Sequence, residues 1–155
     1  MANSKINEAE RLRGLTAKAR QADEARRAKE AEKEAARRQR WESHRSNLEG
    51  LLVQRVAEEI VVRLESSARK MKTVATVRPQ EIALKCGESL RANVVARDVS
   101  LVQSFDGWLT EFVHTARFRN LLNRRLRRDY NLVGEETTGY DPDTREEPAE
   151  LRFSW

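Results

Sequence analysis

Residues 5–45 constrain the fold more than any other part of the chain, because they contain almost nothing to bury. The run QADEARRAKEAEKEAARRQR, residues 21–40, consists almost entirely of alanine, arginine, lysine and glutamate, and these residue types favour a helix. A long helix that lacks an apolar stripe is either held in solvent by its own charge pairs or packed against a partner. The sequence therefore predicts an extended, charged helix over residues 1–45.

Two pairs of opposite charges are spaced to stabilise this helix. Asp23 lies four residues before Arg27, and Glu34 lies four residues before Arg38. Side chains at this spacing are neighbours on a helix surface, and each pair contributes about 0.3 kcal/mol. Such pairs support a helix without giving it a core.

Trp41 is the first large apolar side chain after Leu15, and two interpretations of it are open. Aromatic side chains dominate interface energetics, so Trp41 is a candidate anchor on a partner surface. The other interpretation is that Trp41 marks the place where the helix first contacts its own domain.

The residues after position 46 follow the pattern of an amphipathic helix. Apolar residues recur every three or four positions from Leu48 to Met71, with charged residues between them. Such a helix, ending near Lys72, belongs to a core or to a helix–helix interface. Gly50 is the soft spot near the junction, so one continuous helix and two helices that meet near residues 46–50 both fit the pattern.

Two further elements are expected in the middle of the chain. The run TVATV at residues 73–77 is β-branched and alternating and stops before Pro79, which predicts a strand followed by a helix. The apolar spacing further along predicts a single helix over residues 107–130. The segment 94–105 between them fits either a helical continuation or a strand.

Glycine and proline end the helical pattern near the C-terminus. Residues 130–133 and 151–155 read as short strands on either side of the turn signal YDPDT. They predict a C-terminal hairpin, which can form a three-stranded sheet with residues 73–77. We therefore expect a mainly α (α+β) fold, in which residues 46–155 form a small α+β domain. The last segment, 134–155, holds seven acidic and two basic residues, whereas the whole chain carries a net charge of +5.

The strongest candidate for a binding surface is the run RFRNLLNRRLRR, residues 117–128, which contains six arginines. On the predicted helix, three of the arginines fall within about 40° of one another, and two apolar side chains lie nearby but away from the expected core. Arginine binds phosphates and carboxylates in a bidentate manner, and an aromatic ring can stack on a base or pack on a protein. Nucleic acid, an acidic protein surface and the chain's own acidic tail would all suit this surface, and a solvated basic face would have the same pattern. With Trp41, the candidate binding residues are Arg117, Phe118, Leu121, Arg124 and Arg128.

Catalysis and metal binding receive no support from the sequence. Cys86 is the only cysteine, and neither His44 nor His114 has a second ligand at metal-binding spacing. We expect no catalytic residue, no cofactor and no metal. The chain has no apolar run of about 18 residues and no secretory signal pattern. We therefore expect no membrane span, and a reducing intracellular compartment (cytoplasmic) or a virion as its location.

The layout of a charged N-terminal helix, a small helical domain and a closing hairpin that ends LRFSW resembles that of small proteins of large DNA viruses and phages. Many of those are virion or assembly components, and the resemblance rests on arrangement alone. We expect a non-enzymatic assembly protein that positions other protein chains through its long helix. The alternative function is nucleic-acid binding by the arginines of helix 107–130. A third hypothesis is self-association through residues 48–71.

Overall fold

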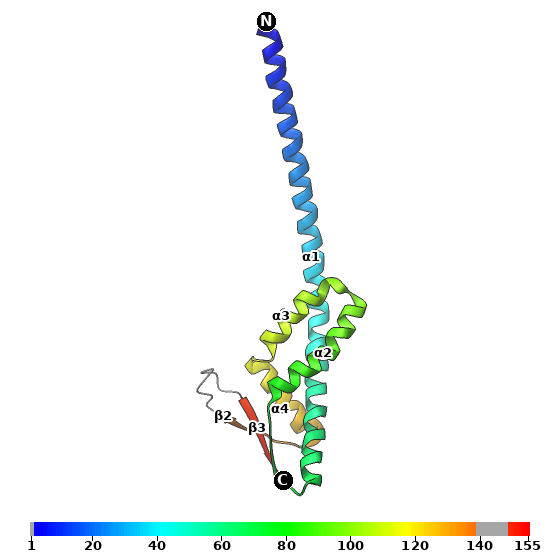
Figure 1. Ribbon diagram of the computed structural model, residues 1–155, viewed down its shortest axis with the longest axis vertical. Helices are drawn as coiled ribbons and strands as arrows, with labels where there is room; N and C mark the ends of the chain where they lie inside the picture. The colour runs from blue at the N-terminus through cyan, green and yellow to red at the C-terminus, as the bar shows by residue number, and fades with distance from the viewer. Residues whose placement is uncertain (1, 139–148) are drawn as a thin grey trace. The chain divides into compact units, whose positions relative to one another are not determined.

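The computed structural model describes the backbone of residues 2–138 and 149–155 and the side chains of residues 7–137 and 150–155. Within these ranges the chain is mainly helical and has one small antiparallel sheet, so the expected fold class is confirmed (Figure 1). The elements in chain order are α1 (Ala2–Arg69), β1 (Val74–Val77), α2 (Pro79–Arg97), the 3-10 turn η1 (Val99–Leu101), α3 (Val102–Phe112), α4 (Ala116–Tyr130), β2 (Glu135–Thr138) and β3 (Ala149–Ser154).

The chain divides into two compact units, Met1–Arg40 and Trp41–Trp155. In the first unit every side chain from residue 7 to residue 40 is exposed, apart from three charged side chains that are half-buried. These three belong to ion pairs within the helix, so the charge pairs expected from the sequence are confirmed. The ion pairs are Arg26–Asp23 (3.0 Å), Arg27–Asp23 (3.4 Å), Arg37–Glu34 (2.8 Å) and Arg38–Glu34 (3.7 Å).

Helix α1 runs without interruption through residues 46–50, so of the two arrangements considered the continuous helix is the observed one. It ends at Arg69, where Met71 adopts a left-handed conformation with φ of 59°. The amide of Lys72 donates to the carbonyl of Ser67 at 3.1 Å, and the amide of Met71 donates to that of Ala68 at 2.9 Å. These bonds form a Schellman motif, which satisfies carbonyls at the helix end.

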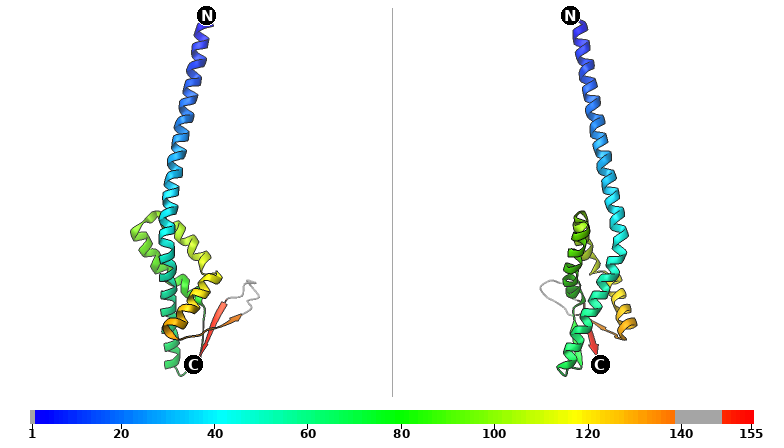
Figure 2. Two further views of the ribbon diagram at one scale, coloured as in Figure 1. Left: turned by 180° about the vertical axis from the view of Figure 1, so that it is seen from behind. Right: turned by 90° about the vertical axis from the view of Figure 1, so that its right-hand side faces the viewer.

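The hydrophobic core that the structure describes lies wholly in the second unit. The C-terminal part of α1 contributes one apolar stripe to it, and α2 and α4 pack on different sides of that stripe (Figure 2). The largest fully buried side chains are Phe105, Phe118, Phe153, Leu52, Ile60, Ile82, Leu90, Leu122, Leu126, Val56 and Val113.

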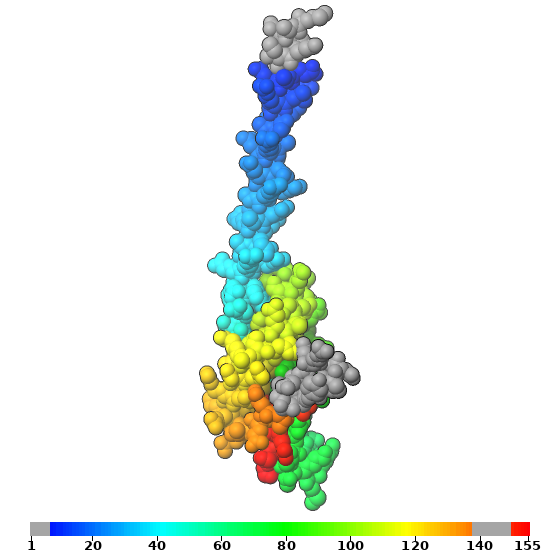
Figure 3. Space-filling model, turned by 90° about the vertical axis from the view of Figure 1, so that its left-hand side faces the viewer, coloured from blue at the N-terminus to red at the C-terminus, as the bar shows by residue number. Residues whose placement is uncertain are grey.

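The sheet has the order β1-β3-β2, and both pairings are antiparallel. Leu151 of the central strand β3 pairs with Val77 on one side and Glu136 on the other, so the expected three-stranded sheet is confirmed. Figure 3 shows β2 (orange) and β3 (red) beside α4 (yellow to orange) on one face of the second unit. The first hairpin strand begins later than the expected residues 130–133, because α4 continues to Tyr130 and is closed by a left-handed asparagine. The turn signal YDPDT lies outside the described residues.

The predicted single helix over residues 107–130 is wrong, because the chain is broken between α3 and α4. Thr115 is in an extended conformation and caps α4, with its Oγ1 accepting the amide of Phe118 at 3.2 Å. An N-cap starts a helix with its own phase, so positions on α3 do not predict the inward face of α4. Phe118, Leu122 and Leu126, at successive spacings of four, form that face and are fully buried. The expectation that Phe118 points away from the core is therefore also wrong.

Candidate functional site

Arg117 at the start of α4 is bound to a buried carboxylate on α1. Its Nε and Nη2 donate to Oε2 of Glu49 at 3.1 and 2.9 Å. The Glu49 side chain is 11% exposed, whereas that of Arg117 is 68% exposed. Arg117 therefore holds α4 against α1, and part of its hydrogen-bonding capacity is already used inside the domain.

Two further arginines of α4 share one carboxylate. Nε of Arg128 lies 2.6 Å from Oδ1 of Asp129, and Nε of Arg125 lies 2.5 Å from Oδ2. The hydrogen bond from Arg128 is the main reason that the pKa of Asp129 lies below its ordinary value. Asp129 therefore stays ionised and holds both guanidinium groups near one end of α4.

Arg124 differs from these arginines because no carboxylate of the described side chains pairs with it. Its side chain is exposed, and within the described side chains no carboxylate lies within ion-pair distance of it or of Arg127. An exposed guanidinium without such a pair can donate two parallel hydrogen bonds to a carboxylate or a phosphate.

A groove between α1 and α4 brings three of the predicted site residues together. It has a volume of about 220 Å³, and we call it the α1–α4 groove. Leu121, Arg124 and Arg128 were predicted as binding residues, whereas the other members were not. The groove is lined by Gly50, Val53, Leu121, Arg124, Arg125 and Arg128.

A second groove of about 440 Å³ adjoins α4 and also contains Arg124. Asn123 lies in its lining, and the side-chain oxygen of Asn123 is buried without a hydrogen-bond partner among the described residues. Arg124 therefore lines both grooves. The second groove is lined by Asn120, Asn123, Arg124, Arg127, Leu132, Val133 and Gly134.

Trp41 packs inside the second unit. Its ring meets that of Trp108 edge to face, with 5.9 Å between the ring centroids, and Trp108 stacks on Phe112 at 5.2 Å. Trp41 is partly buried against the core. Of the two interpretations of this residue, contact with its own domain is the one observed, and Trp41 lines neither of the grooves that contain Arg124.

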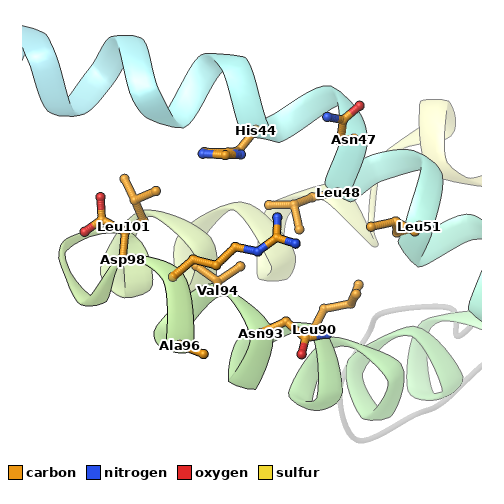
Figure 4. Close-up of a pocket in the computed structure, with 11 residues that line it drawn as sticks. His44, Asn47, Leu48, Leu51, Leu90, Asn93, Val94, Ala96, Asp98 and Leu101 are labelled. Carbon is orange, nitrogen blue, oxygen red and sulfur yellow. The ribbon is translucent and has the colours of Figure 1, made fainter.

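A third hollow, of about 350 Å³, lies between α1, α2 and η1. Figure 4 shows Leu48 of α1 facing Val94 and Leu90 of α2, with His44 above the turn that carries Asp98. Its floor is apolar and its rim is polar. Asp98 is engaged in the cap of η1, where it accepts bonds from the amide and hydroxyl of Ser100, so its carboxylate already serves a structural role.

The α1–α4 groove contains residues that the sequence pattern did not predict as binding residues. Gly50 was noticed only as a soft spot in a helix, and Arg125 falls outside the stripe of the other arginines. Val53 and Glu49 belong to α1, and no spacing in the sequence shows that this helix lies beside α4. The basic run 117–128 was the signal for the α4 side of the groove, and no sequence signal indicated its α1 side.

No family model, curated protein or solved structure matches this chain. None of the described helices has an apolar stretch long enough to cross a bilayer. Over the same residues, no group of histidine, cysteine and acidic side chains is arranged to hold a metal ion. What the protein does must therefore be inferred from its own surfaces.

Proposed function

We propose that the protein is a non-enzymatic assembly component, which positions other protein chains of a larger complex, such as a virion, through the part of α1 that ends at Arg40. The observation that carries this proposal is that no side chain from residue 7 to residue 40 is buried. The recorded ion pairs of this part of α1 are internal, three or four residues apart. Pairs of this kind contribute only a few tenths of a kcal/mol each, so packing against a partner would add much to the stability of the helix.

Leu12 and Leu15 supply apolar contact area for such a partner. They are 56% and 55% exposed, and they lie three residues apart on neighbouring positions of the helix surface. The remaining surface of residues 16–40 is almost entirely alanine and charged side chains, which suits a partner that contacts the helix there through ion pairs. The folded second unit would then fix where this helix is presented.

Truncation tests the proposal most directly. The variant that begins at Trp41 keeps every buried residue of the described core and the contact between Trp41 and Trp108. We expect it to remain folded, as judged by near-ultraviolet circular dichroism, but to be lost from the complex that the full chain forms in its native source. The mass of that complex, measured by light scattering after size exclusion, should fall. An unchanged complex that retains the truncated chain would contradict the proposal.

A milder test leaves the chain at full length. Leu12→Gln and Leu15→Gln together remove the apolar contacts while keeping high helix propensity. Ala25→Gln with Ala28→Gln is the matched control, since both alanines lie on the same exposed helix. We expect the leucine variant to weaken assembly more than the alanine variant, and equal effects would argue against contact through these leucines.

The observations favour this function over nucleic-acid binding. Arg117 and Arg128, two of the three arginines expected to contact phosphates, are bound to Glu49 and Asp129. Phe118, for which stacking on a base was one of two expected roles, is fully buried. If the alternative is nevertheless correct, binding to DNA or RNA must weaken steeply with salt and must be lost when Arg124 is changed to glutamate.

A further inference from the structure

Gly50 occupies a position where nothing in the described fold calls for glycine. It lies inside the 68-residue helix α1, and no glycine of the described chain has a positive φ. A Cβ atom built on Gly50 meets nothing within 4 Å. Glycine inside a helix costs about 0.5–1 kcal/mol relative to alanine. Alanine would therefore make the isolated protein more stable.

The surroundings of Gly50 have the chemistry of a docking groove. Gly50 lines the α1–α4 groove together with Val53, which is 4% exposed, and Leu121, which packs on the core. These residues form an apolar floor that a missing side chain leaves open. The rim is cationic, because it carries Arg124, Arg125 and Arg128. Arg125 and Arg128 share the carboxylate of Asp129, and no carboxylate of the described side chains lies within ion-pair distance of Arg124.

The size and chemistry of the groove select one class of occupant. Its volume of about 220 Å³ is below the roughly 300–1,000 Å³ of typical small-molecule sites. It therefore fits a side chain presented by a larger partner. A phosphodiester backbone would leave the apolar floor uncovered, whereas a protein segment can fill the floor and satisfy the rim together. The net positive rim calls for carboxylates on that segment.

We propose that the α1–α4 groove docks an acidic, amphipathic helix of another protein chain. An apolar side chain of that helix would lie over Gly50, and a carboxylate of that helix would bind Arg124. The guanidinium of Arg124, which pairs with no carboxylate of the described side chains, offers a bidentate contact, while Arg128 is held by Asp129. The absence of a Cβ at Gly50 allows the partner helix to approach α1 closely. Residues 1–40 take no part in this site, so this proposal and the proposed function can fail separately.

The test uses the full-length chain and a synthetic helical peptide labelled with fluorescein, with leucines on one face and glutamates on the other. Fluorescence anisotropy should show saturable binding that weakens as salt is added. Gly50→Leu, which fills the groove, should weaken binding by at least about tenfold, and Arg124→Glu should do the same. The matched control is Gly107→Leu on α3, where a Cβ also meets nothing within 4 Å, and it should bind like the wild type.

Several outcomes would overturn the proposal. Equal affinity of the wild type and Gly50→Leu would show that the peptide does not enter the groove, as would equal binding of a peptide with the same residues in scrambled order. Displacement of the acidic peptide by a single-stranded oligonucleotide, with the Gly50→Leu change leaving oligonucleotide binding intact, would assign the arginines to nucleic acid. Arg124 is exposed, so Arg124→Glu should leave the protein folded. This variant therefore still tests the proposal if Gly50→Leu does not fold.

Discussion

Arg117 and Glu49, which lie 68 positions apart in the chain, form a two-bond contact in which Nε and Nη2 of the arginine donate to the same carboxylate oxygen. Glu49 is the one buried charged residue among the described side chains. A buried carboxylate needs a partner, because losing that partner leaves a charge that water cannot fully solvate. The contact therefore fixes α4 against α1, and it also sets the position of the groove between them.

Arg117→Met should lower the free energy of unfolding by about 1–3 kcal/mol, because it leaves Glu49 buried and unpaired. Arg124→Met is the control, and it should change stability by less than about 0.5 kcal/mol, since Arg124 is exposed and pairs with no described carboxylate. Urea unfolding followed by circular dichroism measures both. Combining Arg117→Met with Glu49→Met should recover part of the stability that Arg117→Met loses. If Arg117→Met and Arg124→Met lower the free energy of unfolding equally, the pair of Arg117 and Glu49 has no special role.

Trp41 sets the boundary of the folded domain. A chain that begins at residue 46, where the sequence pattern placed the domain, loses the edge-to-face contact with Trp108. Because Trp41 is partly buried, we expect that chain to be about 1–2 kcal/mol less stable than one that begins at residue 41. Trp41→Ala in the full chain should cost a similar amount. If the two truncated chains have the same urea midpoint, Trp41 contributes nothing to the domain.

Two glycines in neighbouring helices should respond to alanine in opposite directions. A Cβ on Gly87 of α2 would lie 2.4 and 2.9 Å from the methyl groups of Leu109, whereas one on Gly107 of α3 meets nothing within 4 Å. Gly87→Ala should cost about 1–2 kcal/mol, because overpacking outweighs the gain in helix propensity. Gly107→Ala should raise the free energy of unfolding by about 0.5–1 kcal/mol. Thermal unfolding of the two variants measures both effects, and stabilisation by Gly87→Ala would contradict the close packing of α2 on α3.

Much of the fold can be predicted from patterns of residues that are close together in the sequence. The β-branched run before Pro79 predicted β1 and the start of α2, because proline cannot continue a strand but suits a first helical turn. The amphipathic spacing after residue 46 predicted the core stripe of α1. In each case the deciding interactions lie within a few residues of one another.

The failures occurred where the deciding interactions were unrecognised or distant. The break before α4 depends on Thr115 as a cap, and no glycine or proline marks it, so the helical phase was carried across it and placed Phe118 outside the core. The pairing of Arg117 with Glu49 joins two helices whose contact no spacing reveals. The basic run identified the candidate surface, but only the packing of α4 on α1 determines which arginines are free.

Cys86 should make stability depend on alkaline pH. Burial, followed by the negative charge of Glu59, raises the pKa of the Cys86 thiol, although Arg55 and Arg63 act in the opposite direction. The unfolded chain therefore releases this proton at lower pH than the folded chain. The free energy of unfolding should begin to fall once pH passes the ordinary thiol pKa and should go on falling up to the raised one.

Urea unfolding at a series of pH values measures this slope, and Cys86→Ala is the matched variant because it removes the titrating group from a partly buried position. In that variant the part of the slope due to the thiol should disappear. A second readout is the rate of thiol alkylation, which should be slower in the folded protein than in urea at mildly alkaline pH. Identical pH slopes for the two proteins would contradict the raised pKa.

Met71 at the end of α1 should be improved by glycine. Its φ of 59° is left-handed, where a Cβ is strained, and its side chain is 93% exposed, so few contacts compensate. Met71→Gly should raise the free energy of unfolding by about 0.5–1 kcal/mol. Met71→Ala keeps the Cβ and should bring no such gain. Asn131→Gly, at the other left-handed residue, should gain less because asparagine tolerates this conformation. Urea midpoints of the three variants should therefore rank Met71→Gly first, and a gain from Met71→Ala as large as that from glycine would show that strain at the Cβ is not the cause.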